Sequence, residues 1–545
     1  MKRILLATIA MAVAISASAC TNLIVGKKAS TDGSVMCSYS ADSYGLFGDL
    51  RHYPAARHAK GAMRAVIDYD TYVKHGEIPE AEETYNVMGN INEYQVSVGE
   101  TTFGGRHELL DTTGIIDYGS LMYIALQRSK TALEAIHVMT DLVARYGYCS
   151  EGETFTICDP NEAWIMEMVG KGAGRKGAVW VALRIPDDAI CAHANQSRIT
   201  TFDRKDKQNV LYAKDVITFA REKGYFTGKD SEFSFNAAYA APDFSGRRYC
   251  EARVWTFFNR FKSDMNRYLP YVEGRAKDAE PMPLWVVPDK KVSLQDMQTA
   301  MRDHYEGTPF AMDADPGAGP YLSPYRPTPL EFEVDGKKYF NERPISTMQT
   351  GFTYVAQLRG WLPRQVGGIL WFGNDDSNMV AYTPVFGSAT RQPECYHTPG
   401  ANAVTFSDKN AFWVCNWVSN MVYPRYAQLF PDLKAVRDSL EQSYSKELPD
   451  VDKKAQSLLA QSENQAVEFL TNYGCEKGAE MLSEWHSLAI RLIVKHNDTA
   501  VKNEVGGHFE TTPEGVAKIT RPGYPDAAKR ELIKLTGDRF AVPEE

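Results

Sequence analysis

Several features that would assign this chain of 545 residues to a well-marked class of protein are missing from it. The sequence has no CxxC, no HExxH and no other paired cysteine–histidine spacing, so a zinc site has little support and we expect no metal. Apart from one apolar run of about 12 residues near the start, no stretch approaches 18 apolar residues. We therefore expect no stable insertion into a membrane.

The charge pattern excludes a further class. No basic patch interleaves with aromatic residues, and the formal net charge is -9, so nucleic acid is not an expected partner. Internal repeats, low-complexity segments and linkers rich in Gly, Pro and Ser are also absent. What remains is the composition of an ordinary globular protein, with 44% hydrophobic residues.

One glycine-rich segment could be taken for a dinucleotide-binding motif. Gly172-Ala-Gly174-Arg-Lys-Gly177 matches the GxGxxG fingerprint of dinucleotide sites. The segment that follows, Ala178 to Ile185, is strand-like, whereas the fingerprint requires a helix to start there. The glycines therefore predict a hairpin turn, and we expect no cofactor.

The first 19 residues have the pattern of a secretory signal, with two basic residues, an apolar run and a small-x-small site that ends at Ala19. Cleavage after Ala19 would make Cys20 the first residue of a periplasmic or secreted protein. Such a cysteine carries a thiol and a free α-amine that can act as its base, so Cys20 is the candidate nucleophile. A lipidated cysteine is the alternative, although lipoprotein signals usually carry Leu where this chain has Ala17.

The residues from Cys20 to about Tyr39 predict a β-hairpin, because two apolar runs flank a turn that contains Asp32-Gly33. A turn centred near residues 30 and 31 pairs positions whose numbers sum to about 61. This register places Asp42 beside Cys20.

Further along, the apolar periodicity predicts sheets with helices segregated between them, which favours an α+β fold. We expect helices within residues 117–146, 209–224 and 249–262, and strands at 94–99, 155–158, 163–169, 178–185 and 189–193. Residues 431–496 are strongly helical in pattern, with a break expected at Pro449.

An N-terminal cysteine nucleophile needs oxyanion donors, a group that orients the amine and a substrate anchor. Asn92 and Asn195 lie at the edges of predicted strands and are candidates for the oxyanion, although an asparagine there is more often a turn former. Asp42 is the candidate for orienting the amine. Arg253 fits an active-site role or a core-edge ion pair equally well.

The remaining cysteines give no better nucleophile. Cys149 lies in Gly147-Tyr-Cys-Ser-Glu-Gly, whose spacing differs from the GxSxG elbow, so it is more simply a structural residue. An oxidising periplasm would allow disulfides, but most of the other cysteines sit singly in apolar runs, which favours buried free thiols.

The start of the predicted mature chain, Cys20-Thr-Asn-Leu-Ile-Val-Gly-Lys-Lys-Ala-Ser-Thr-Asp-Gly-Ser34, resembles that of the cysteine dipeptidases (dipeptidase A-like) of the N-terminal-nucleophile hydrolases. The resemblance extends from residue 20 to about 430 through motifs in the same order: Asn92-Glu93, Gly99-Glu-Thr-Thr102, Asp159-Pro-Asn-Glu-Ala-Trp164, His193-Ala-Asn195-Gln and Gly307-Thr-Pro309. Penicillin V acylases and bile-salt hydrolases are distant relatives of this family.

The resemblance implies a four-layer αββα fold for residues 20–430, with residues 431–545 as a mainly helical extension. It implies hydrolysis of short peptides without a cofactor. The catalytic residues that it carries over are Cys20, Asp42, Asn92, Asn195 and Arg253.

One position departs from the pattern. Many relatives carry Arg where this chain has Tyr39, so a cation that would lower the thiol pKa is missing. Either another basic residue replaces it or the substrate preference differs. For the ammonium group of a peptide substrate, charge complementarity suggests a buried carboxylate such as Glu93 or Glu100.

Two other functions stay open on the sequence alone. One is an acylase or amidase of the same fold, and the other is a lipoprotein that binds peptides without cleaving them. Small peptides are the expected partners, and a homo-oligomer is left open.

Overall fold

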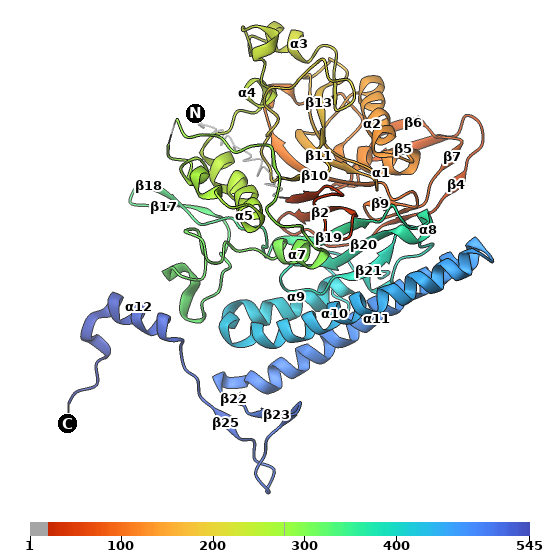
Figure 1. Ribbon diagram of the computed structural model, residues 1–545. Coiled ribbons are helices and arrows are strands. Elements are labelled where there is room, and N and C mark those ends of the chain that lie inside the picture. Colours follow the sequence, from red (N-terminus) through yellow and green to blue (C-terminus); the bar gives the residue numbers. More distant parts are fainter. Residues whose placement is uncertain (1–19, 277, 545) are drawn as a thin grey trace, which may run out of the picture.

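Two antiparallel β-sheets form the centre of the computed structural model, which describes residues 20–276 and 278–544 (Figure 1). The signal segment predicted at residues 1–19 lies outside the described residues. The seven-stranded sheet has the order β16 (Trp285–Val286), β14 (Ile190–His193), β1 (Asn22–Val25), β2 (Val35–Asp42), β19 (Thr350–Leu358), β20 (Gly368–Asn374) and β21 (Thr383–Phe386). The eight-stranded sheet has the order β15 (Val210–Tyr212), β13 (Ala178–Ile185), β12 (Ala163–Gly170), β11 (Gly152–Cys158), β10 (Ser97–Gly104), β9 (Ile91–Asn92), β8 (Val87–Met88) and β3 (His52–Tyr53).

The first hairpin has the predicted register. In β1 and β2, Ile24 pairs with Cys37 and Thr21 forms a bridge with Ser40, so paired numbers sum to 61. Gly33 supplies the turn with φ +85°, a conformation that residues with a side chain rarely adopt. The chain therefore returns at Ser40 to Asp42 beside Cys20, as the sequence predicts.

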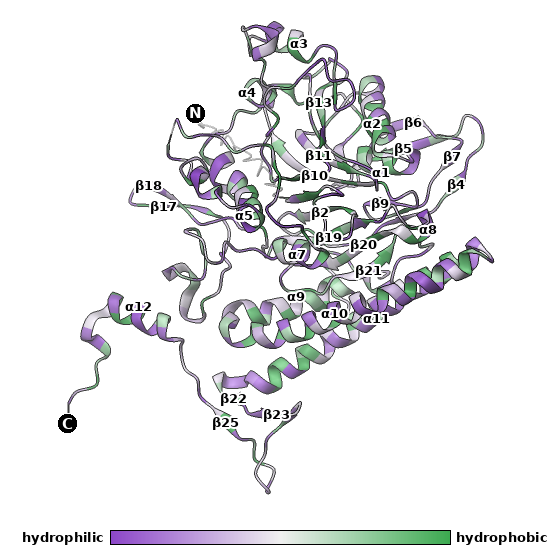
Figure 2. Ribbon diagram, viewed as in Figure 1, coloured by the Kyte–Doolittle hydropathy of each residue, from purple (hydrophilic) through white to green (hydrophobic). Residues whose placement is uncertain are grey.

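Each sheet is buried on both faces, as β12 illustrates. Trp164 and Met166 pack into a hydrophobic cluster with helices α1 (Tyr118–Arg128) and α2 (Ala132–Tyr146). The alternate residues Ala163 and Ile165 pack into a second cluster shared with β1 and β2. The two sheets thus face each other across one core, and Figure 2 shows hydrophobic residues along the strands of both.

Helices cover the outer face of the seven-stranded sheet as well. These are α5 (Ala252–Phe261), α7 (Leu294–Ala300), α9 (Ala411–Val422), α10 (Tyr426–Leu459) and α11 (Glu463–His496), which contact β14, β19, β20 and β21. The α+β class predicted from the sequence is confirmed. No helix in the described part of the chain is long and apolar enough to cross a membrane.

The expected break at Pro449 is wrong, because α10 runs through this proline to Leu459 and the chain turns only at residues 460–462. A proline removes one helical hydrogen bond, and here buried Tyr444 and Val451 on either side hold the helix against the core. Leu433 of α10 and Trp485 of α11 belong to the same core cluster as the sheet. The helical pair therefore packs against the seven-stranded sheet.

Two other elements differ from expectation. The strand expected at 94–99 is β10, which starts at Ser97, and the segment 209–224 begins with β15 before helix α3 (Val216–Glu222). The remaining strands are β4 (Ala56–Arg57), β5 (Met63–Ile67), β6 (Lys74–Pro79), β7 (Glu83–Thr84), β17 (Glu331–Val334), β18 (Lys337–Phe340), β22 (Val501–Lys502), β23 (Glu504–Val505), β24 (His508–Phe509) and β25 (Ile519–Thr520). The remaining α-helices are α4 (Phe235–Tyr239), α6 (Leu269–Val272), α8 (Arg364–Gly367) and α12 (Asp526–Thr536), and a π-helical segment covers Gly246–Glu251.

Candidate active site

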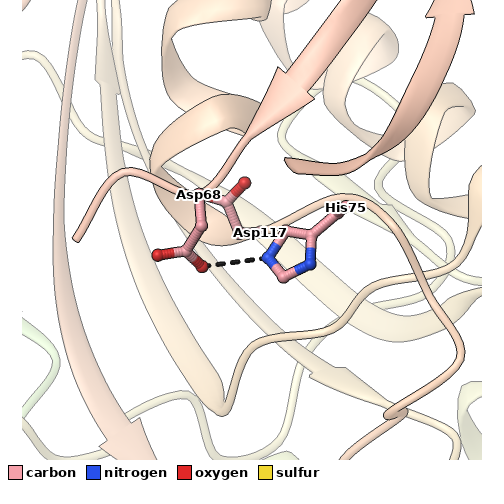
Figure 3. A group of neighbouring side chains, drawn as sticks. All are labelled: Asp68, His75 and Asp117. Atoms are coloured by element: carbon pink, nitrogen blue, oxygen red, sulfur yellow. Dashed lines mark hydrogen bonds and ion pairs between the residues drawn. The ribbon is translucent and has the colours of Figure 1, made fainter. Parts of the chain in front are cut away.

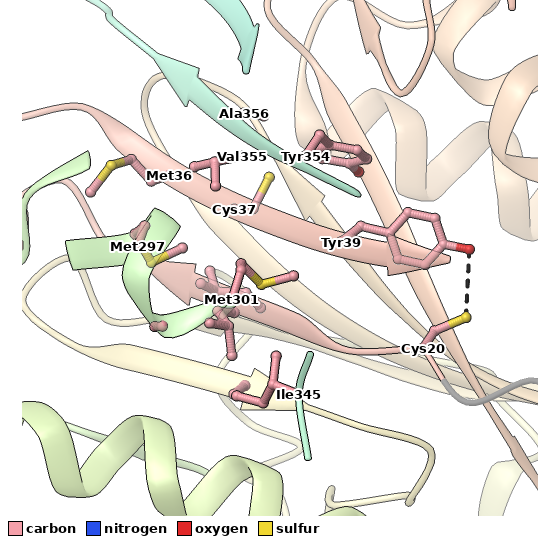
Figure 4. Packing of buried hydrophobic residues seen from close by; sticks show 14 of the residues in the cluster. Cys20, Met36, Cys37, Tyr39, Met297, Met301, Ile345, Tyr354, Val355 and Ala356 are labelled. Carbon is pink, nitrogen blue, oxygen red and sulfur yellow. Dashed lines mark hydrogen bonds between the residues drawn. The ribbon is translucent and has the colours of Figure 1, made fainter. Parts of the chain in front are cut away.

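Cys20 lies two residues before β1, in contact with Glu100 on β10 of the opposite sheet and with Tyr39 on β2 of its own. Its Sγ atom is 3.6 Å from Oε1 of Glu100. It is also 3.7 Å from the Tyr39 hydroxyl, and Figure 4 marks this second contact. Cys20 is 1% exposed, Tyr39 is 3% exposed and Glu100 is completely buried. A potential nucleophile thus meets a carboxyl group and a phenol in a buried setting.

An open edge of β10 makes this approach possible. β10 pairs with β11 along its whole length but with β9 only at Ser97, so the edge beyond Ser97 has no neighbouring strand there among the described residues. Two asparagines satisfy backbone carbonyls at this edge: Asn22 donates to Glu100 O at 2.6 Å and Asn195 donates to Thr102 O at 2.7 Å. The start of β1 and the end of β14 are therefore attached to the strand that carries Glu100.

Tyr39, at the position where the family resemblance predicted an arginine, is hydrogen-bonded to Glu100. Its hydroxyl donates a hydrogen bond of 2.6 Å to Oε1 of Glu100. Burial, together with the nearby Cys20 and Glu100, raises the pKa of Tyr39 well above its usual value, so the phenol stays protonated and can only donate to a carboxylate.

Glu153 is a second buried carboxyl group beside Glu100. Glu153 on β11 pairs with Thr102 of β10, and its Oε1 accepts from the Thr102 hydroxyl at 2.7 Å. The two carboxyl groups affect each other's pKa, and neither Oε2 atom has a hydrogen-bond partner among the described residues. Two buried carboxyl groups so close disfavour each other's ionisation, so the pair holds protons to a higher pH than a free glutamate does.

Burial raises the pKa of Glu100 to about 7, and burial plus the charge on Glu100 raises the pKa of Glu153 well above its usual value. Asp70 adds a further negative charge that acts on Glu100. Above about pH 7 Glu100 therefore carries a negative charge beside the thiol. The hydrogen bonds of the two glutamates within the described residues come from Tyr39 and Thr102, which are uncharged.

Arg253 fastens the Cys20 backbone to Asn195. One terminal nitrogen donates to Cys20 O and to Thr21 Oγ1, both at 2.8 Å, and the other donates to Ala194 O and Asn195 Oδ1, both at 3.0 Å. The side chain is 1% exposed, and burial and the neighbouring Arg343 lower its pKa. Of the two roles left open by the sequence, the geometry favours a positioning residue at the active site.

Asp42 is held rigidly near the start of the chain. Its carboxylate accepts from Arg343 Nη2 at 2.8 Å, from Thr350 Oγ1 at 2.7 Å and from Ser40 Oγ at 3.1 Å. Asp42 is completely buried, and Arg343 is almost completely so. The cation missing at position 39 is thus present nearby as Arg343, but it contacts Asp42.

Asn195 adopts φ +62°, a left-handed conformation that Asn tolerates better than most residues. With Arg253 on its Oδ1 and Thr102 O on its Nδ2, its side chain is fixed beside the Cys20 backbone. His193, two residues earlier, is buried between Thr101 and Thr156, and burial lowers its pKa well below the usual value. The imidazole of His193 therefore stays neutral, and both of its ring nitrogens are hydrogen-bonded to the two threonines.

Two predicted residues are not brought to Cys20. The amide of Asn92 donates to Leu126 O and Ser129 O and accepts from the backbone N–H groups of Tyr94 and Val96. It organises the turn between β9 and β10 and the end of α1, and no capacity remains for an oxyanion.

The carboxylate of Glu93, like the amide of Asn92, is engaged by other groups of the protein. It forms an ion pair of 2.6 Å with Arg364 of α8 and accepts from Asn86 N. Of the two carboxylates suggested for a substrate ammonium, only Glu100 lies at the thiol.

Comparison with known proteins assigns the chain. The model of peptidase family C69 matches residues 19–439. The chain belongs to peptidase family C69. The predicted family resemblance is thereby confirmed, and the protein is a peptidase.

Its curated relatives are named as dipeptidases. The chain is 26% identical over 420 residues to a "Probable dipeptidase" of Salmonella dublin, covering 73% of this chain and 88% of the relative. It is 23% identical over 499 residues to "Dipeptidase A" of Lactobacillus helveticus, covering 86% and 97%. The match to a "Probable dipeptidase" of Latilactobacillus sakei is 26% over 436 residues, covering 76% and 82%.

The C69 match begins at residue 19, next to Cys20, and covers every residue that the structure gathers there. The sequence missed Glu153, Arg343 and the role of Tyr39. Glu153 lies two positions before buried Phe155, so a strand pattern puts both on one face, but only the register with β10 brings it to Glu100. The eight other cysteines carry free thiols, as expected for most of them.

Proposed function

We propose that this C69 peptidase is a secreted dipeptidase whose nucleophile, Cys20, is exposed when a signal peptide is removed after Ala19. The observation that carries the proposal is the contact of the Cys20 thiol, at the start of β1, with buried Glu100 at 3.6 Å. Dipeptidase names among the relatives support the substrate class. The two facing sheets with helices outside them agree with the four-layer αββα fold of N-terminal-nucleophile hydrolases.

The proposed reaction starts with transfer of the thiol proton to the free α-amine of Cys20. The thiolate attacks the peptide carbonyl carbon, and the carbonyl oxygen becomes an oxyanion. The α-ammonium then returns the proton to the leaving amine as the C–N bond breaks, which leaves a thioester. Water, deprotonated by the same amine, then attacks the thioester. The Cys20 thiolate leaves, and the N-terminal amino acid of the dipeptide is released.

The residues around Cys20 have distinct roles in this proposal. Asn195, locked by Arg253, stabilises the oxyanion, because its side chain is fixed beside the Cys20 backbone. Asp42, held by Arg343, orients the α-amine from the neighbouring strand. Asn92 has no part, since its amide is used by backbone groups elsewhere.

The ammonium group of the substrate binds at Glu100 in this proposal. An ammonium about 4 Å from one carboxylate gains roughly 4 kcal/mol at the effective dielectric typical of protein sites. Ionised Glu100 places a negative charge beside the thiol, which suits a free amino end. The same charge disfavours penicillin V and conjugated bile acids, whose acyl groups carry no ammonium at that place.

Hydrolysis assays test this function against the two alternatives. The mature chain is given a panel of dipeptides, their N-acetylated forms, penicillin V and conjugated bile acids. Cleavage of free-amine dipeptides that Cys20→Ala abolishes and Cys149→Ala leaves intact supports a cysteine dipeptidase. Cleavage of acyl substrates alone would instead establish an acylase.

The N-terminus itself decides the lipoprotein alternative. The intact mass and N-terminal sequence of the protein from a secreting host should show unmodified Cys20 as the first residue. A diacylglyceryl group on Cys20 would refute the enzymatic proposal, because it removes nucleophile and base together.

A further inference from the structure

Three side chains of metal-binding type meet at the tip of the β5–β6 hairpin, outside the residues assigned to catalysis. Asp68 follows β5, His75 lies in β6 and Asp117 precedes α1. One donor atom from each lies within 4.8 Å of the others. Oδ2 of Asp68 is 3.0 Å from Nε2 of His75, a contact marked in Figure 3. No motif predicted this group, because its members are 7 and 42 residues apart.

The two carboxylate oxygens of Asp117 have different surroundings. Its Oδ1 caps α1 by accepting from Ser120 N at 2.9 Å, and it also accepts from Tyr69 N. Its Oδ2 is buried and has no hydrogen-bond partner among the described residues, in a side chain that is only 2% exposed. A buried carboxylate oxygen left unsatisfied is costly, and a bound cation would satisfy it.

Asp68 also presents one oxygen to the group. Its Oδ1 accepts from the backbone N–H groups of Asp70 and Thr71 and from the Thr71 hydroxyl, which holds the carboxylate in place. Its Oδ2 faces His75. Within the described part of the chain, no Lys or Arg forms an ion pair with Asp68 or Asp117. Two carboxylates therefore converge without a basic side chain to neutralise both.

We propose that Asp68, His75 and Asp117 bind one divalent cation of the Zn²⁺ class, which ties the β5–β6 hairpin to the start of α1. An imidazole nitrogen among the donors favours Zn²⁺ over Ca²⁺ or Mg²⁺, which prefer oxygen alone. Bonds of about 2.0–2.2 Å bring donors to within about 4 Å of each other, so small rotations close the site. Asp68 and His75 remain about one quarter exposed, which leaves an entry path and room for water.

The place of the site gives the cation a structural role. Tyr118, next to Asp117, donates to Asp70 Oδ2 at 2.9 Å, and Asp70 lies two residues after Asp68. Tyr118 is partly buried and packs against the hydrophobic cluster that contains α1 and α2. The cation would thus fix the β5–β6 hairpin against the start of α1. The inference does not depend on the reaction proposed above.

Binding is tested on the mature chain carrying Cys20→Ala, so that the thiol cannot take the metal. After treatment with a chelator, calorimetry with Zn²⁺ should give one site per chain, and Zn²⁺ should raise the melting temperature. Asp117→Asn keeps the helix cap, because Asn caps as well as Asp, but replaces one carboxylate donor. Asp117→Asn and His75→Gln should each weaken binding by about a hundredfold or more.

A matched control is His58→Gln, which removes a half-buried histidine bonded to Thr84 outside the group and should leave Zn²⁺ binding unchanged. Without metal, Asp117→Asn should be at least as stable as the parent, because carboxylate repulsion is relieved; saturating Zn²⁺ should reverse that order. Unchanged affinity in Asp117→Asn, the absence of a single site in the parent, or an equal response to Ca²⁺ would overturn the proposal.

Discussion

Replacing Glu100 by Gln should stabilise the protein at neutral pH while impairing catalysis. The ordinary pKa of a glutamate is 4.5, and burial raises that of Glu100 to about 7. The folded chain therefore keeps a proton that the unfolded chain loses, so stability falls as the pH rises between these values. This difference corresponds to about 3 kcal/mol, and it is not reduced by solvent screening because Glu100 is 0% exposed.

A glutamine side chain at this position would fit the same contacts without the charge. Its carbonyl oxygen can accept from Tyr39, and its amide can donate to the Oε2 of Glu153, which has no other partner among the described residues. The free energy of unfolding of the wild type should therefore fall by about 3 kcal/mol more than that of Glu100→Gln between about pH 4.5 and pH 8. Urea denaturation of both mature proteins at several pH values measures this, with the exposed Glu273→Gln as a control that follows the wild type.

The same substitution should reduce kcat/KM for free-amine dipeptides by about a hundredfold, because removing one member of a buried charge pair costs roughly 2–5 kcal/mol. Two results would refute the reasoning. Stability curves that stay parallel over the whole pH range would show that Glu100 loses its proton at the ordinary pH. Unchanged kcat/KM would show that the substrate ammonium binds elsewhere.

Three further substitutions or extensions test the site. Cys20→Ser should keep at most a small residue of activity with an unchanged circular dichroism spectrum, because a hydroxyl is far less acidic than a thiol; full activity would place the nucleophile elsewhere. A chain made in the cytoplasm with Met-Ala retained before Cys20 should be inactive, because the α-amine becomes an amide; full activity, with the extension confirmed by mass spectrometry, would exclude the amine as base. Tyr39→Phe removes a hydrogen bond that lowers the pKa of Glu100, so the rise of kcat/KM with pH should move to higher pH and stability near pH 8 should fall by about 1.5–3 kcal/mol; an unmoved profile would contradict this.

The sequence allowed the first hairpin and the main strands to be predicted because their information is local. Asp32-Gly33 and two apolar runs set the turn, and the turn sets the register that returns Asp42 to Cys20. The uninterrupted apolar patterns of β12 and β13 likewise determine strands that are buried on both faces. Local signals also misled, since Pro449 lies inside α10 where burial of neighbouring residues outweighs one lost hydrogen bond.

The rest of the site depends on contacts between distant segments. Glu153 reaches Glu100 only through the β10–β11 register, and Arg343 comes from an irregular segment some 300 residues after Asp42. Neither contact leaves a pattern in its own neighbourhood. Asn92 shows the opposite error: a motif position suggested catalysis, whereas its amide holds backbone groups of α1 and the β9–β10 turn.

The electrostatics of the site link the proposed substrate preference to the chemistry of the thiol. A carboxylate 3.6 Å from Cys20 opposes formation of the thiolate, and position 39, where the family resemblance predicted an arginine, is an uncharged tyrosine. In the proposed mechanism two positive groups can offset this charge: the protonated α-amine of Cys20 and the ammonium of the substrate bound at Glu100. A peptide with a free amino end therefore supplies part of the field that stabilises the thiolate, whereas an N-acetylated peptide does not. If so, acetylation should lower kcat as well as raise KM, and an effect on KM alone would show that the ammonium contributes only to binding.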